Sequence, residues 1–155
     1  MPSAHWKRAA TKPRRIIDSC VLIAAPWNPD CSRYLAALGH QHHGLMTHNL
    51  LGEALAEVSR KFGDEALRRD FHLLVDRFLT EGKITILRLG CIPPEDVESL
   101  RSALPFLSKD DAVHLAEAMV HGVTEFVTID KELTNRINRQ RLAELGLHIV
   151  DSGEV

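Results

Sequence analysis

Four acidic residues stand where a carboxylate could take part in chemistry. Asp18 follows two isoleucines in an apolar run, and Asp130 follows the apolar segment 125–129. Asp111 comes three residues after Ser108 at the start of a helical pattern, and Glu53 lies in the early turns of another. Burying a carboxylate is costly unless it is paired, protonated or bound to a metal ion. Asp18 most needs such a reason, because apolar residues surround it.

The segments that must position these acids alternate between strand and helix patterns. Helical periodicity or helix-start signals mark residues 28–38, 50–58, 65–79, 93–96 and 108–122, whereas strand character marks residues 16–23, 44–47, 83–89, 125–129 and 147–150. The segment 16–23 has the composition of a central strand buried on both faces, and 83–89 that of an edge strand. This alternation predicts an α/β fold with three α/β/α layers, in which helices cover a mainly parallel sheet of about five strands.

The predicted sheet brings the four acids together. Crossover helices begin near the carboxyl ends of parallel strands, and ligands bind at this edge where the strand order reverses. Carboxylates that meet there raise one another's pKa, so the cluster is stable mainly with a divalent cation. Oxygen ligands favour Mg²⁺ or Mn²⁺, and such an ion suits phosphodiester hydrolysis by a metal-activated water.

Length and composition limit the other possibilities. The 155 residues, 45% of them hydrophobic, predict one globular domain over residues 14–155 after a flexible tail at residues 1–13. A net charge of −2 is not the signature of a general nucleic-acid binder. Three cysteines without a CxxC pair indicate a reducing compartment, so we expect a cytoplasmic protein. No apolar run approaches the roughly 18 residues that span a membrane.

Four motifs carry a family resemblance: IIDSCVLIA, THNLLGEALAEV, KDDAVHLAEA and VTIDKEL, at residues 16–24, 47–58, 109–118 and 127–133. In this order they resemble PIN-domain ribonucleases, particularly the VapC-type toxins of toxin–antitoxin pairs, and the likeness extends over residues 14–151. The resemblance implies a PIN-like fold and Mg²⁺- or Mn²⁺-dependent cleavage of RNA. It also implies a homodimer and a small antitoxin protein that enters the acidic site. The catalytic and metal-binding residues that it implies are Asp18, Glu53, Asp111 and Asp130, with Thr128 as a supporting hydroxyl.

One residue departs from the family pattern. The family usually has Asn, Ser or Thr two positions after the first aspartate, whereas this chain has Cys20. A thiol is a weak hydrogen-bond partner, so the support of a metal-bound water is altered or passes in part to Ser19.

Basic residues and histidines are weaker candidates for the site. The candidate phosphate contacts are Arg14, Arg15, Lys109, Lys131, Arg136 and Arg139. Four histidines between His40 and His48 match no standard zinc spacing, so we expect a solvated loop there. We interpret His114 as a satisfied, partly buried histidine rather than a general base.

Other interpretations stay open from sequence. Asp111 and Asp130 could be helix caps only, and Glu53 could be a solvated surface acid. The protein could be a PIN-like nuclease that processes RNA or acts on DNA without an antitoxin, or an inactive PIN-like binding module. A receiver-like module with Asp18 as phosphoacceptor would normally have a lysine at the end of its last strand, whereas this chain has Asp151 there.

Overall fold

The computed structural model describes residues 12–88 and 92–155, and its centre is a sheet of five parallel strands. The strands lie in the order β3-β2-β1-β4-β5. The sheet therefore confirms the predicted fold class. The predicted tail at residues 1–13 falls almost entirely outside the described residues. The strands are β1 (Arg14–Ile17), β2 (His43–Thr47), β3 (Ile84–Leu87), β4 (Glu125–Thr128) and β5 (His148–Asp151).

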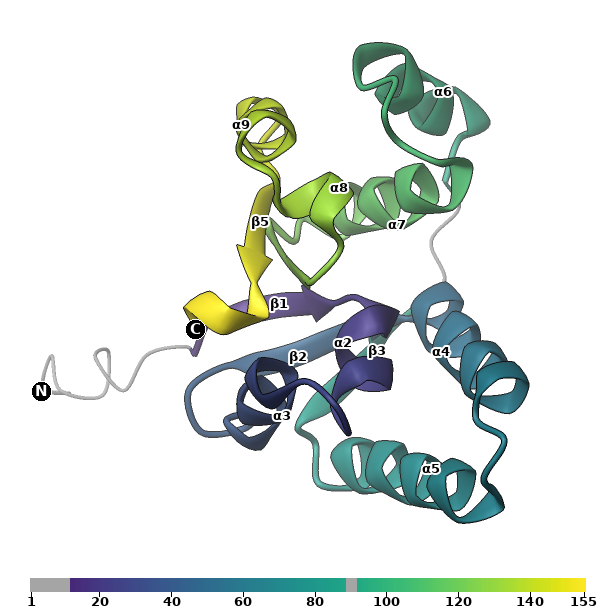
Figure 1. Cartoon of the computed structure of the whole chain (residues 1–155). Helices are drawn as coiled ribbons and strands as arrows, with labels where there is room; N and C mark the ends of the chain where they lie inside the picture. The colour runs from purple at the N-terminus through teal and green to yellow at the C-terminus, as the bar shows by residue number, and fades with distance from the viewer. Residues whose placement is uncertain (1–11, 89–91) are drawn as a thin grey trace, which may run out of the picture.

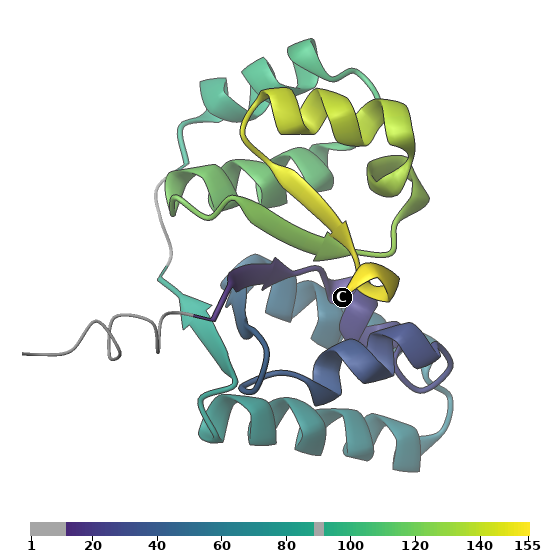
Figure 2. The ribbon, with the colours of Figure 1, turned by 90° about the vertical axis from the view of Figure 1, so that its left-hand side faces the viewer.

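Helices cover both faces of this sheet (Figures 1 and 2). Right-handed crossovers place the connections that run β1 to β2 to β3 on one face, and those that run back to β4 and β5 on the other. The first group comprises α2 (Ser19–Ala24), α3 (Pro29–Ala36), α4 (His48–Lys61) and α5 (Glu65–Thr80). The second comprises α6 (Pro94–Ala103), α7 (Lys109–Val120), α8 (Lys131–Thr134) and α9 (Arg136–Glu144), and the 3-10 turn η1 (Ser152–Glu154) follows β5.

The strand order reverses between β1 and β4. The chain leaves β1 toward β2 and β3 on one side, and then returns to place β4 and β5 on the other. The carboxyl ends of β1 and β4 therefore lie side by side, with Ile17 opposite Val127 in register. This is the position at which open α/β sheets bind ligands.

Local sequence signals set the helix ends near this position. The Ser108 hydroxyl accepts a hydrogen bond from the backbone N–H of Asp111 at 3.1 Å, and Thr47 caps α4 in the same way through the N–H of Leu50. Asp130 caps α8 by accepting from the N–H of Glu132 at 2.9 Å. Gly122, with φ of 67°, closes the turn after α7 in the left-handed region that glycine favours.

The hydrophobic core lies on both sides of the central strands. Ile16, Ile17 and Leu45 are fully buried, as is Leu115 of α7. Close packing extends to Gly44 in β2, where an added Cβ would lie 2.7 Å from Cδ1 of Ile17. Strand β3 lies at the edge of the sheet, as predicted.

Two predictions are wrong in detail. The apolar run 16–23 is not one strand: β1 ends at Ile17, and Val21 and Leu22 bury their side chains from helix α2. A short apolar run cannot distinguish a buried strand from a buried helical turn. The loop at residues 40–48 is not simply solvated either, because His42 is fully buried and stacks on Tyr34 at a centroid distance of 4.0 Å.

Candidate active site

The four predicted acids occupy the carboxyl edge of the sheet. Asp18 directly follows β1, and Asp130 lies two residues after the end of β4. Glu53 lies on α4, whereas Asp111 lies in the first turn of α7. The two strands supply acids from the reversal point, and the two helices supply them from opposite faces of the sheet.

The Asp18 carboxylate is buried and held by hydrogen bonds. Its Oδ2 accepts from the Thr128 hydroxyl at 2.7 Å and from the Cys20 thiol at 3.4 Å. Thr128 in turn accepts from the backbone N–H of Asp130 at 3.0 Å, so one hydroxyl connects two of the acids. Burial raises the pKa of Asp18 and Glu53 raises it further, although the bonds from Thr128 and Cys20 act against this.

Cys20 lies inside this arrangement. Its sulfur is 3.4 Å from both Asp18 Oδ2 and the Thr128 hydroxyl. Burial, and then the nearby Asp18 carboxylate, raise the pKa of Cys20 far above the ordinary range of a thiol. The side chain is therefore a neutral S–H that donates weakly to Asp18.

Glu53 is held from two sides. Its Oε1 accepts from the Ser19 hydroxyl at 2.8 Å, and its Oε2 lies 2.6 Å from Nε2 of His114. The Ser19 hydroxyl also lies 3.5 Å from Asp18 Oδ1, at the limit of a hydrogen bond. Ser19 thus lies between Asp18 and Glu53.

Asp111 completes the cluster from α7. Burial is the main cause that raises the pKa of Asp111, and the negative charges of Asp130 and Asp18 add to it. Asp18, Asp111 and Asp130 are therefore close enough for their charges to interact. Such a group of carboxylates attracts a cation.

The donor set fits a hard divalent ion. All four acids offer oxygen ligands, which Mg²⁺ and Mn²⁺ prefer. Asp18 and Asp130 each use one carboxylate oxygen in a close hydrogen bond to a neighbour. Across residues 12–88 and 92–155, however, no three His, Cys, Asp or Glu side chains are already arranged to hold a metal. The acids fit the ion by donor type and charge.

The basic candidates separate into two groups. Lys109 and Lys131 are the exposed first residues of α7 and α8, next to the acids. In contrast, Arg14 and Arg15 begin β1 at the opposite end from Asp18. Arg15 pairs there with Glu125 at 2.6 Å. Arg136 is exposed at the start of α9, and Arg139 pairs with Glu154.

His114 contacts the acidic site, although its sequence pattern predicted only a satisfied histidine. This residue is buried, contacts Glu53, and has an Nδ1 without a hydrogen-bond partner in the described part of the chain. Only one of its two ring nitrogens therefore has a partner among the described residues. A signal was present in the sequence, since His114 lies three residues after Asp111 and shares its helix face.

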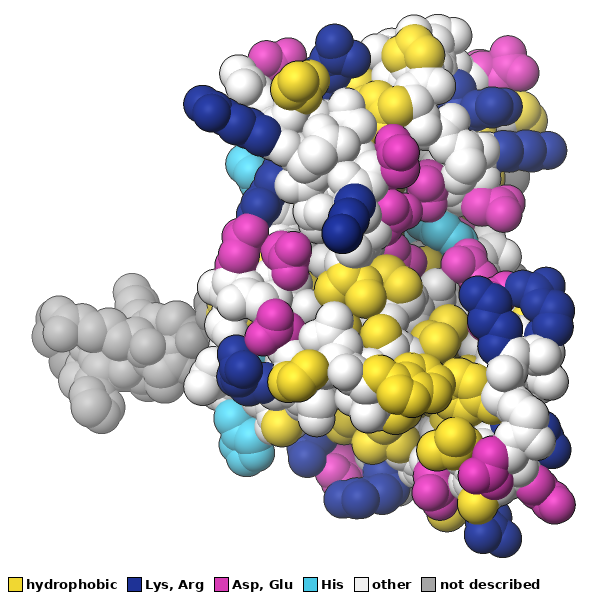
Figure 3. All heavy atoms as spheres, in the orientation of Figure 1, with side chains coloured by type: hydrophobic (Ala, Val, Ile, Leu, Met, Phe, Trp, Pro, Cys, Tyr) yellow, Lys and Arg dark blue, Asp and Glu magenta, His cyan; other side chains and the backbone are white. Residues whose placement is uncertain are grey.

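The surface around the acids is acidic on one side and hydrophobic on the other. Figure 3 shows acidic side chains gathered between the two helical layers and a hydrophobic surface below them, over α2 and toward α4 and α5. Trp27, 62% exposed, packs edge-on against Phe62.

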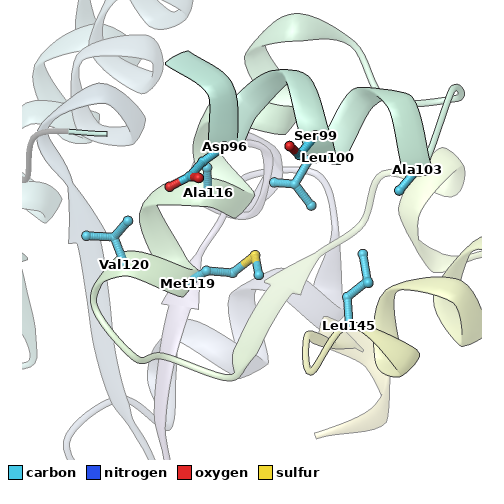
Figure 4. Close-up of a pocket in the computed structure, with 8 residues that line it drawn as sticks. All are labelled: Asp96, Ser99, Leu100, Ala103, Ala116, Met119, Val120 and Leu145. Atoms are coloured by element: carbon cyan, nitrogen blue, oxygen red, sulfur yellow. The ribbon is translucent and has the colours of Figure 1, made fainter. Parts of the chain in front are cut away.

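A separate apolar cavity of about 400 Å³ lies between α6 and α7. Leu100, Met119 and Leu145 converge on it (Figure 4). None of the four acids lines this cavity.

Comparison with known proteins relates this fold to solved structures. No family model matches the chain, and no curated protein matches it in sequence. Similar solved structures include VapBC2 from Rickettsia felis bound to a DNA fragment from its promoter, a toxin–antitoxin complex from Klebsiella pneumoniae, and the sarcin–ricin loop cleaving toxin VapC20 from Mycobacterium tuberculosis.

These likenesses extend over most of each chain. The TM-scores are 0.62, 0.57 and 0.53, and the identities are 14%, 16% and 15%. The alignments cover 89%, 89% and 85% of this chain and 98%, 97% and 95% of the others. The chain therefore has the fold of VapC-type PIN domains, as its sequence motifs predicted.

Proposed function

We propose that this protein is a divalent-metal-dependent endoribonuclease that acts as the toxin of a type II toxin–antitoxin pair. The observation that carries the proposal is the convergence of Asp18, Glu53, Asp111 and Asp130 on the reversal point of the sheet. The fold supports it, because the similar structures include a toxin that cleaves the sarcin–ricin loop.

The residues have distinct proposed roles. Asp18, Glu53, Asp111 and Asp130 would together hold Mg²⁺ or Mn²⁺. When bound, the ion supplies a reactive water and stabilises the negative charge that develops on the phosphate. Thr128 holds Asp18 and the Asp130 backbone in one arrangement through its two hydrogen bonds, with Cys20 as a weaker second donor to Asp18.

The RNA substrate would be bound by its backbone. Lys109 and Lys131 are exposed beside Asp111 and Asp130, so their ammonium groups can neutralise phosphates on either side of the acids. Arg136, exposed at the start of α9, is a further candidate for a phosphate contact. The ion pairs of Arg15 and Arg139 favour structural roles for these two arginines.

The partners follow from the same proposal. Two of the similar structures are a VapBC assembly and a toxin–antitoxin complex, which supports an antitoxin protein for this chain. We further propose a cytoplasmic homodimer. None of the helices in residues 12–88 and 92–155 is long and apolar enough to cross a membrane. A small neighbouring gene whose product copurifies with this chain and blocks RNA cleavage would separate a toxin from an RNA-processing nuclease.

The decisive experiment is RNA cleavage by Asp18→Asn and Asp130→Asn variants in Mn²⁺. Each should lose on the order of 10²–10³-fold in rate, because removing one negatively charged ligand weakens binding of the ion that stabilises the transition state. The matched control is Asp76→Asn, which neutralises an exposed acid on α5 and should cleave like the wild type. Chelation should stop the wild type. Full activity in either site variant, or in chelator, would refute the proposal.

A further inference from the structure

His114 connects the two helical layers at the carboxyl edge. It lies on α7, and its Nε2 is 2.6 Å from Oε2 of Glu53 on α4, across the edge of the sheet. The His114 side chain is 7% exposed, whereas that of Glu53 is 40% exposed. A buried group thus holds a carboxylate that is itself open to solvent.

The chemistry of the two groups determines which one donates the hydrogen bond between His114 and Glu53. An ionised carboxylate only accepts hydrogen bonds, so Nε2 of His114 carries the hydrogen and donates it to Glu53. Ser19 donates to the other carboxylate oxygen at 2.8 Å. Two donors, one from α7 and one from α2, therefore hold Glu53 in a single orientation beside Asp18.

A purely structural role explains His114 poorly. Its Nδ1 is buried and has no hydrogen-bond partner within the described ranges. An apolar side chain of similar volume would fill the same space without a buried unpartnered nitrogen. The feature of histidine that this position uses is the N–H aimed at Glu53.

We propose that His114 is a positioning residue of the acidic site, which orients Glu53 toward the ion through its Nε2–H donor; the role in catalysis rests on the proposed nuclease function. Without this donor, the flexible Glu53 side chain would turn away from the like-charged Asp18 and into solvent. Outer donors of this kind tune both the affinity for a metal ion and the rate.

The test compares three variants of the full chain. His114→Gln keeps an amide N–H at a similar reach, whereas His114→Leu fills the space without a donor. His121→Leu, at the C-cap of the same helix and seven residues beyond His114, is the matched control. The measurements are Mn²⁺ affinity by titration calorimetry with the metal alone, kcat and KM for a single-stranded RNA, and the thermal unfolding temperature in chelator.

We expect His114→Leu to lose about 10–100-fold in Mn²⁺ affinity and in kcat, with KM for RNA little changed. Its unfolding temperature in chelator should not fall below that of the wild type, since the unpartnered nitrogen is gone. His114→Gln should recover most of the Mn²⁺ affinity, and His121→Leu should match the wild type throughout.

Two results would overturn the inference. One is wild-type Mn²⁺ affinity in His114→Leu, and the other is a His114→Gln variant as impaired as His114→Leu. Should the leucine variant not fold, His114→Asn replaces it, because its shorter amide cannot reach Glu53 as glutamine does. A wild type that binds Mn²⁺ but does not cleave RNA would refute the nuclease proposal alone, and the affinity comparison would still decide the role of His114.

Discussion

Two groups of charged side chains in this molecule differ in how their negative charges are compensated. Near the C-terminus, Nη1 and Nη2 of Arg139 each lie 2.5 Å from an oxygen of Glu154, and Nε donates to the carbonyl of Ile149 at 2.9 Å. At the carboxyl edge, the acids face one another, and their side-chain donors are two hydroxyls, a thiol and an imidazole.

The pKa values reflect this difference. The Arg139 guanidinium lowers the pKa of Glu154 by hydrogen bonding, whereas burial and like charges raise the pKa of Asp111. The negative charge of a paired carboxylate is already compensated by its partner. Buried carboxylates that face one another destabilise the fold until a cation binds. The acids at the carboxyl edge therefore have the features of a binding site, whereas the Arg139–Glu154 pair has those of a structural ion pair.

The largest expected effect is that of a metal ion on the thermal stability of the fold. An ion that binds only the folded chain stabilises it by about 2.7 kcal/mol at a hundred times its dissociation constant. We therefore expect millimolar Mn²⁺ or Mg²⁺ to raise the thermal unfolding temperature by several degrees, as measured by calorimetry against a chelator control.

The matched variants make that test specific. Asp130→Asn should reduce the shift, because it removes a proposed ligand. Glu154→Gln should keep the full shift, because Glu154 belongs to the paired group. An equal shift in Asp130→Asn would show that the ion binds elsewhere.

A smaller effect is expected from neutralising one acid without metal. Asp18→Asn removes a buried charge that faces Glu53, while the amide oxygen still accepts from Thr128. The variant should gain about 1 kcal/mol in free energy of unfolding, the usual size of a single substitution, in urea with chelator at pH 7. A loss of stability would mean that the Asp18 charge is already well compensated in the metal-free chain.

The sequence predicted the sheet and the placement of the acids because both depend on local patterns. Apolar strands at residues 44–47 and 125–129, together with the Ser108 cap, limit the topology to few arrangements, and the topology places the acids. Carboxylates at strand and helix ends can therefore be located from the amino-acid sequence alone.

Contacts between side chains of distant segments were not predictable in this way. His114 and Glu53 are 61 residues apart, and an imidazole reaches the carboxylate only because α7 and α4 meet across the carboxyl edge of the sheet. The pairing of Arg139 with Glu154 likewise depends on how α9 packs beside β5. Both contacts join different elements, where spacing along one helix gives no information.

The smallest expected effect concerns the paired group and its pH dependence. Because Arg139 lowers the pKa of Glu154 in the folded chain, the pair stabilises the fold above the ordinary pKa of 4.5 and this contribution disappears as pH falls through the lower, folded value. Both side chains are partly exposed, so Glu154→Gln should cost only about 0.5 kcal/mol at pH 7. Urea unfolding between pH 7 and pH 3 should show the difference from the wild type shrinking toward acid, while Glu98→Gln, at an exposed acid of α6, shows little difference throughout. A difference that instead persists at pH 3 would mean that Glu154 acts through packing rather than through its charge.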